Sequence, residues 1–167
     1  MPRLVLMGAP GSGKSTIGRT LARKLDSELI DTDAMIEERT GRKISDIFVE
    51  SGEAEFRRIE REVVLESLQA KDAIVALGGG SVLDEDVQRA MGDLSTVVYL
   101  EVSISNAAPR IGLNKERPLL LAAPRAQWLS LMEARRPIYE RLAKFTFSTD
   151  NRKPNEVAAE ILEKVPL

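Results

Sequence analysis

The sequence of 167 residues contains no cysteine and no histidine. Without cysteine, the chain can form no disulfide framework, thiol nucleophile or thiolate metal site. Without histidine, it lacks the most common acid–base residue and the most common ligand of transition metals. These two absences exclude Ser-His-Asp hydrolases, papain-like enzymes and zinc proteases. The chemistry that remains belongs to carboxylates, lysine, arginine, hydroxyls, backbone dipoles and hard cations.

The chain also lacks an excess of charge of one sign and a long hydrophobic run. Its 24 basic and 26 acidic residues give a net charge of −2, so no general basic field attracts nucleic acid. No apolar stretch is long enough to span a membrane, and no signal-peptide pattern is present. We therefore expect a cytoplasmic protein that binds neither nucleic acid nor membrane and is by default a monomer.

Length and hydrophobic patterning indicate one α/β domain over residues 1–167. Short apolar runs, expected to form a mostly parallel sheet, alternate with helical patterns. The expected strands are 4–7, 28–30, 73–77, 96–100 and 145–148. Helices are expected over 14–25, 34–39 and 53–68, from a cap at Asp84 to Met91, and from Pro154 onward. Residues 112–124 show neither the alternation of a strand nor the spacing of an amphipathic helix, which favours a loop or lid.

Residues 8–15 read Gly-Ala-Pro-Gly-Ser-Gly-Lys-Ser and match the P-loop pattern G-x-x-x-x-G-K-[ST]. The glycines allow backbone N–H groups to face phosphate oxygens, and the following helix directs its positive end to the same place. Lys14 can neutralise the β- and γ-phosphates, while the Ser15 hydroxyl suits Mg²⁺. With a strand before it and a helix after it, this segment predicts a nucleotide site rather than a turn with a solvated lysine. The residues expected to contact ATP here are Gly11, Ser12, Gly13, Lys14, Ser15 and Thr16.

Two aspartates end the second expected strand, where open α/β sheets bind ligands. Because side chains alternate along a strand, Asp31 and Asp33 should project to the same side. One carboxylate could hold the water shell of a metal, while the other accepts a hydrogen bond from an acceptor hydroxyl and serves as base. The alternative is that Asp33 merely caps the following helix.

Three glycines, Gly78, Gly79 and Gly80, follow the third expected strand. Glycine at this end of a strand allows the backbone to approach a ligand closely. The alternative is a flexible turn.

Taken in order and spacing, these motifs resemble the shikimate kinases over essentially the whole chain. The matching residues are the P-loop, Asp31-Thr32-Asp33, Phe56-Arg57, the glycines at 78–80, Arg117-Pro118-Leu119, and Arg135 with Pro137 and Tyr139. The resemblance implies a three-layer P-loop fold with a five-stranded parallel sheet of order 2-3-1-4-5 and a mobile lid. It also implies that ATP phosphorylates the 3-hydroxyl of shikimate, giving shikimate 3-phosphate and ADP in aromatic amino-acid biosynthesis.

The resemblance further implies a role for individual residues. Asp33 corresponds to the residue that binds the reacting hydroxyl. Arg57 and Arg135 correspond to the pair that holds the shikimate carboxylate. The three glycines correspond to the wall of the shikimate pocket. Arg117 resembles the lid arginine that moves onto the transferring phosphoryl group. On the nucleotide side, Arg110 and Pro154 match positions beside adenine, and Ser15 directly and Asp31 through water match the magnesium site.

Several of these residues have a simpler interpretation. Arg57 lies in a charged stretch and could be solvated or paired, and Glu60 could be its partner or could orient it toward substrate. Arg136 competes with Arg135 for the inward position, although the Arg-x-Pro-x-Tyr spacing favours Arg135. Phe48 and Phe56 could line the pocket or only fill the core. Arg110 could simply be exposed.

Two other functions remain open at this point. A P-loop kinase for a sugar acid such as gluconate, or for a nucleotide, could use the same arginines. A nucleotide-binding regulatory module without catalysis should lack Asp33 or a pocket arginine, and this chain has both.

Overall fold

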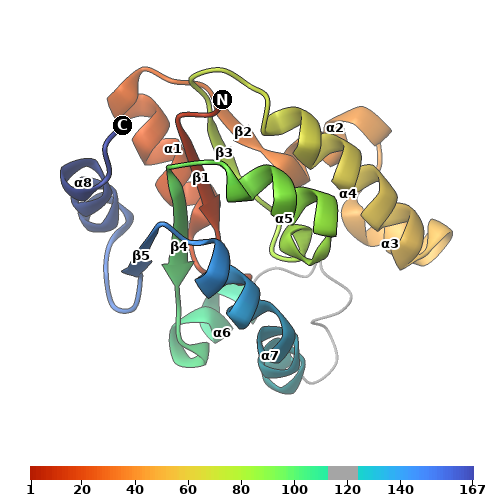
Figure 1. Cartoon of the computed structure of the whole chain (residues 1–167). Coiled ribbons are helices and arrows are strands. Elements are labelled where there is room, and N and C mark those ends of the chain that lie inside the picture. Colours follow the sequence, from red (N-terminus) through yellow and green to blue (C-terminus); the bar gives the residue numbers. More distant parts are fainter. Residues whose placement is uncertain (113–123) are drawn as a thin grey trace.

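Five short parallel strands form the sheet at the centre of the fold (Figure 1). The structure is a computed structural model that describes residues 1–112 and 124–167. The strands are β1 (Leu4–Met7), β2 (Leu29–Asp31), β3 (Ile74–Ala76), β4 (Val97–Glu101) and β5 (Phe145–Ser148), and their order is β2-β3-β1-β4-β5. The sheet order implied by the resemblance is therefore confirmed.

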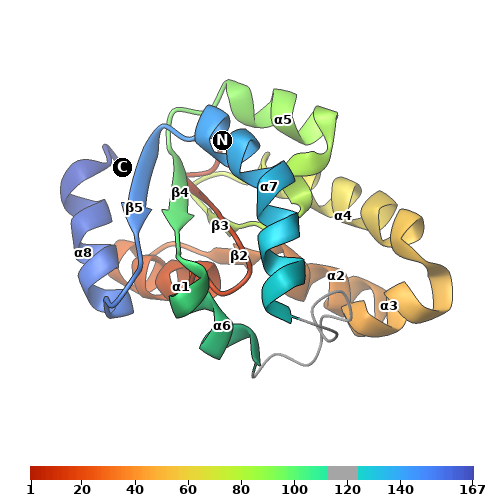
Figure 2. The ribbon, with the colours of Figure 1, turned by 90° about the horizontal axis from the view of Figure 1, so that it is seen from below.

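Helices cover both faces of the sheet, which makes the fold three layers thick (Figure 2). Side chains alternate along β1. Leu4 and Leu6 pack with α1 (Lys14–Leu25) and α8 (Pro154–Lys164) on one face. Val5 and Met7 pack on the other face with α4 (Glu53–Ser67), α5 (Glu85–Gly92) and α7 (Pro124–Leu142). Because both faces are buried, the strand is a continuous apolar run.

Three helices and a 3₁₀ turn were not expected from the sequence. These are α3 (Ile44–Ser51), α6 (Ile104–Gly112), α7, and η1 (Ser81–Leu83). Both α6 and α7 contain an internal proline, Pro109 and Pro137, and internal proline normally argues against a helix. In α7 the buried Trp128 and Tyr139 pack into the core, and this packing outweighs the lost backbone hydrogen bond. The expected lid over 112–124 falls almost entirely on residues 113–123, which lie outside the described part of the chain.

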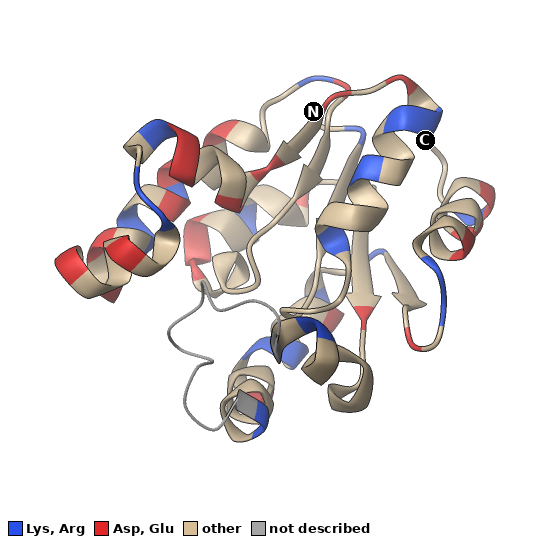
Figure 3. Cartoon of the chain, turned by 180° about the vertical axis from the view of Figure 1, so that it is seen from behind, with Lys and Arg blue, Asp and Glu red and all other residues tan. Residues whose placement is uncertain are grey.

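The helices α2 (Thr32–Thr40), α3 and α4 enclose a smaller apolar cluster beside the sheet, built around Ile36, Ile47 and Phe56. Acidic and basic residues are interspersed on this side of the molecule (Figure 3). They form ion pairs, including Arg39 with Glu66. No helix in the described ranges is both long and apolar enough to cross a membrane.

Candidate active site

The phosphate-binding loop joins β1 to α1 and lies at the carboxyl edge of the sheet. Gly13 adopts a left-handed conformation, with φ of 90°, immediately before the first turn of α1. Gly13 is the N-cap and supplies no side-chain cap, so the positive end of the helix faces the loop. The Lys14 ammonium donates to the carbonyls of Gly8 at 2.8 Å and Ala9 at 3.0 Å. The lysine is thus held inside the loop, beside the place where phosphates bind in P-loops.

Asp31 links the phosphate-binding loop to α2. One of its carboxylate oxygens accepts a hydrogen bond from the Ser15 hydroxyl. The other accepts from the backbone N–H groups of Asp33 at 3.1 Å and Ala34 at 3.2 Å, so Asp31 is the N-cap of α2. The alternative that Asp33 caps this helix is therefore wrong.

Asp33 lies in the first turn of α2 rather than on the strand, because β2 already ends at Asp31. Strand alternation was expected to bring the two carboxylates to one side. That reason is wrong, because only Asp31 belongs to the strand. Both residues nevertheless line one cavity of about 410 Å³ together with Lys14, Ser15 and Arg110. This cavity places the Asp33 carboxylate beside the phosphate-binding loop.

The three glycines after β3 lie close to charged side chains, and a larger residue at any of them would displace its neighbour. A Cβ on Gly78 would lie 2.5 Å from Asp33 Oδ1, and a Cβ on Gly80 would lie 2.4 Å from Arg57 Nη1. A Cβ on Gly79 would lie 3.3 Å from Arg135 Nη1. We call these residues the glycine wall. It is not merely a flexible turn, because each glycine leaves room for a different predicted site residue.

Thr32, the middle residue of the Asp31-Thr32-Asp33 motif, helps to fix this wall. Its buried hydroxyl accepts a hydrogen bond from the N–H of Gly78 at 3.0 Å. The available signal in the sequence was a threonine between two aspartates. Its partner lies 46 residues away in the sequence, so the contact itself could not be read from local spacing.

Arg57 and Glu60 form a partly buried ion pair on α4. Arg57 Nη1 lies 2.7 Å from Glu60 Oε1, and the side chains are 26% and 5% exposed. Burial raises the pKa of Glu60 above its usual value, while the Arg57 charge opposes that rise. Arg57 also lies against the ring of Phe56, 5.3 Å from its centroid. Glu60 therefore holds the guanidinium in position, and Arg57 is not simply a solvated charge.

The two aromatic residues on this side pack against each other. Phe56 is only 4% exposed and belongs to the small cluster of α2, α3 and α4. The partly buried Phe48 packs against it, with ring centroids 4.7 Å apart. Phe56 thus fills the core and supports Arg57, while Phe48 is only partly buried beside it.

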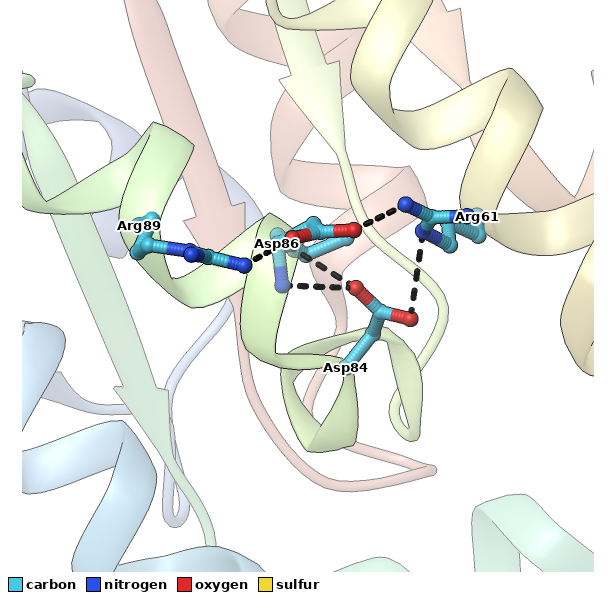
Figure 4. A network of polar contacts seen from close by, with 5 residues as sticks. Arg61, Asp84, Asp86 and Arg89 are labelled. Atoms are coloured by element: carbon cyan, nitrogen blue, oxygen red, sulfur yellow. Dashed lines mark hydrogen bonds and ion pairs between the residues drawn. The ribbon is translucent and has the colours of Figure 1, made fainter.

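A network of ion pairs connects α4 to α5 beside the glycine wall (Figure 4). Arg61 pairs with Asp84 at 3.6 Å and also with Asp86, which pairs in turn with Arg89. Asp84 caps α5 as expected, because its carboxylate accepts from the N–H groups of Asp86 and Val87. The network holds the helix that carries Arg57 against the segment that follows the wall.

Arg135 is the inward-facing member of its arginine pair. It is 4% exposed and lies against Gly79, whereas Arg136 is exposed. This resolves the ambiguity between the two in favour of Arg135.

The other end of the phosphate-binding loop opens to a smaller cavity of about 170 Å³. Arg110 and Pro154 both line it, together with Thr16. Arg110 donates to the carbonyl of Gly11 at 2.8 Å, so its exposed side chain lies across the loop. Arg117, the expected lid arginine, lies outside the described residues.

Several known proteins resemble the chain over nearly its whole length. The model of the shikimate kinase family matches residues 10–166. The chain is 50% identical over 165 residues to a shikimate kinase of Thermobifida fusca, covering 99% of this chain and 95% of the relative. It is 48% identical to one from Rhodococcus erythropolis, covering 98% and 97%. The solved structure of shikimate kinase from Acinetobacter baumannii in complex with shikimate matches with a TM-score of 0.92 at 32% identity, covering 98% of this chain and 94% of that one.

Proposed function

The chain belongs to the shikimate kinase family, and we propose that it transfers the γ-phosphoryl group of ATP to the 3-hydroxyl of shikimate, giving shikimate 3-phosphate and ADP. The observation that carries this proposal is the position of Gly79. A Cβ there would lie 3.2 Å from Pro10 of the phosphate-binding loop and 3.3 Å from Arg135 Nη1. The donor site and a carboxylate-binding arginine therefore share one wall. The reaction belongs to aromatic amino-acid biosynthesis.

ATP binds, in this proposal, along the phosphate-binding loop. Residues 11–16 surround the phosphates with backbone N–H groups and the Lys14 ammonium. Arg110 and Pro154 flank the base at the smaller cavity, which they both line.

The oxygen ligands near Ser15 fit Mg²⁺. Within the described residues, no group of three or more His, Cys, Asp or Glu could hold a metal. Mg²⁺, however, binds through few protein oxygens together with substrate phosphates and water. The Ser15 hydroxyl and the Asp31 carboxylate, which contact each other, are such oxygens. When bound, the ion neutralises charge on the transferring phosphates.

Shikimate carries a carboxylate, and the two arginines beside the wall suit it. A guanidinium presents parallel N–H groups that match a carboxylate in two places. Arg57 lies against Gly80 and Arg135 against Gly79, so both reach the same short segment. With the carboxylate held there, Asp33 is positioned for the hydroxyl that reacts.

The reaction is an in-line transfer in which positioning and charge neutralisation dominate. The 3-hydroxyl oxygen forms a bond to the γ-phosphorus while the bond from that phosphorus to ADP breaks. The hydroxyl proton passes to the Asp33 carboxylate, and Lys14 neutralises charge on the phosphates. The family resemblance gives Arg117 a further stabilising role from the lid.

The wider context belongs to the same proposal. We infer one domain over residues 1–167 that acts as a monomer in the cytoplasm, with two small-molecule substrates and no nucleic-acid or membrane partner. A net charge of −2 supports only the absence of a nucleic-acid partner, because it gives no general attraction for a polyanion.

Calorimetric titration tests the assignment of the acceptor site. Arg57→Ala should weaken shikimate binding about 30-fold, at the lower end of the roughly 2–5 kcal/mol that truncating a buried charge pair costs, because Arg57 is only partly buried. Binding of ADP should change little, because the phosphate-binding loop lies on other elements. Arg136→Ala, at an exposed neighbour of Arg135, is the matched control and should bind both ligands as wild type does. Wild-type shikimate affinity in Arg57→Ala would refute the assignment.

A further inference from the structure

Tyr139 on α7 lies between the two halves of the proposed site. Its side chain is completely buried, and its ring stacks on Tyr99 of β4 with centroids 5.1 Å apart. Its hydroxyl donates to the carbonyl of Gly79, at the centre of the glycine wall. The same hydroxyl lies 3.2 Å from the carbonyl of Gly8, the first residue of the phosphate-binding loop. One phenol thus contacts segments that are 131 and 60 residues distant in the sequence.

The contact with Gly79 matters because of peptide geometry. In a planar trans peptide, the carbonyl of one residue and the N–H of the next point in opposite directions. Fixing the carbonyl of Gly79 therefore also fixes the direction of the N–H of Gly80. A peptide between two glycines has little steric preference of its own, so its orientation needs an external contact.

The rest of the wall is held by local contacts. The carbonyl of Gly78 accepts from the N–H of Ser81 at 3.1 Å, and that of Gly80 accepts from Leu83 at 3.1 Å. The donor to Gly79 comes instead from α7, one helical turn after Arg135. The helix that supplies the inward arginine thus also orients the backbone next to it.

The hydroxyl has a single proton, so its two carbonyl contacts are not equivalent. The shorter contact is with Gly79. The carbonyl of Gly8 already accepts from the Lys14 ammonium at 2.8 Å. The geometry therefore assigns the proton of Tyr139 mainly to Gly79.

We propose that Tyr139 is a positioning residue for the acceptor: its hydroxyl holds the peptide between Gly79 and Gly80 in the orientation that shikimate binding requires. This inference rests on the proposed function of the glycine wall. It adds to that function a residue that touches neither substrate directly but acts through the backbone.

The test compares Tyr139→Phe with Tyr99→Phe. Both changes remove one hydroxyl from a buried ring of the same stacked pair, but the Tyr99 hydroxyl interacts with Arg136 instead of the wall. In Tyr139→Phe we expect the KM for shikimate to rise about 10-fold, since a buried carbonyl loses its donor. The KM for ATP and kcat should change by less than about 3-fold, and Tyr99→Phe should leave the shikimate KM unchanged.

Two results would overturn the inference. One is an unchanged shikimate KM in Tyr139→Phe. The other is an equal rise in both variants, which would indicate a general packing effect. Thermal unfolding of both variants measures any loss of fold separately.

A second readout does not depend on shikimate turnover. In ¹⁵N-labelled protein, the amide of Gly80 should exchange with solvent at least about 10-fold faster in Tyr139→Phe than in wild type or Tyr99→Phe, because its peptide is no longer fixed. Equal exchange in all three proteins would refute the inference even if wild type failed to use shikimate. Failure of wild type to bind shikimate, by contrast, would contradict the proposed function alone.

Discussion

Replacing Gly80 with alanine should damage shikimate binding without damaging the fold. The backbone at this residue has φ of −93° and ψ of −1°, a conformation that alanine adopts readily. The obstacle is the space that the new methyl group would occupy. Its Cβ would lie 2.4 Å from Arg57 Nη1, 2.6 Å from Nη2 and 2.8 Å from Cζ.

The size of the effect follows from these distances. Non-bonded heavy atoms rest at about 3.5 Å or more, so the guanidinium has to move by about 1 Å. The guanidinium is the flexible end of the Arg57 side chain, which is 26% exposed. It can therefore move without disturbing the core. A shift of that size nevertheless displaces the guanidinium from the position in which Glu60 Oε1 holds it at 2.7 Å. Misplacing a binding group by 1 Å can cost about 10²-fold.

Steady-state kinetics with each substrate varied in turn measures this effect. We expect Gly80→Ala to lower kcat/KM for shikimate about 10- to 100-fold, mainly through KM, and to leave the KM for ATP within about 3-fold of wild type. Gly92→Ala is the matched control, because a Cβ at the end of α5 would meet nothing within 4 Å. A Gly80→Ala protein with wild-type shikimate kinetics would refute the contact between the wall and Arg57. Unfolding of this variant at room temperature would also contradict the reasoning.

Three further predictions concern other parts of the site. Asp33→Asn should lower turnover by about 10²–10⁴-fold while calorimetry shows unchanged ADP binding, and unchanged turnover would exclude Asp33 as the base. Burial raises the pKa of Glu60, so ionising it costs stability as pH rises from the unfolded value through the raised one. In urea unfolding, the stability of Glu60→Gln relative to wild type should therefore increase as pH rises from 4 to 7. A decrease would show that the pKa of Glu60 is lowered in the folded protein and not raised. The single tryptophan, Trp128, donates a hydrogen bond to the carbonyl of Pro10 in the phosphate-binding loop at 3.0 Å. Binding of Mg-ADP should therefore change the fluorescence of Trp128. An unchanged emission spectrum at saturating Mg-ADP would argue against this contact.

Local patterns predicted the phosphate-binding loop and the central strands well. The loop depends on a short run of glycines between a strand and a helix, and β1, α1 and β5 have the expected bounds. Buried strands covered on both faces are apolar runs, which makes them easy to find. The sheet order came from the family resemblance, because strand pairing depends on contacts between distant segments.

The errors and omissions have physical causes. The helices α6 and α7 were missed because internal proline normally ends a helix, and here tertiary packing outweighs that cost. Asp31, and not Asp33, caps α2 because the chain enters the helix at Thr32, whereas strand alternation assumed extended backbone as far as Asp33. A shift of one or two residues at an element boundary decides which carboxylate caps and which faces the cavity.

The residues that act through long-range contacts were the hardest to predict. The three glycines were expected to allow close approach, but their individual neighbours, Asp33, Arg135 and Arg57, emerge only from the packing of separate elements. Tyr139 belongs to the Arg-x-Pro-x-Tyr motif, yet its contact with Gly79 joins α7 to a turn that is 60 residues away in the sequence. Sequence spacing indicated which residues belong to the site, and the fold supplied the reason for each.

A coupled assay of ADP release with Mg-ATP tests the central claim most directly. Shikimate, gluconate and the nucleoside monophosphates would be compared as acceptors at equal concentration. The arginines beside the glycine wall and Asp33 at the phosphate-binding loop predict turnover with shikimate at least about 10²-fold faster than with any other acceptor. Faster turnover with gluconate or a nucleotide would contradict the acceptor site, and Mg-ATP binding without turnover on any acceptor would contradict catalysis itself.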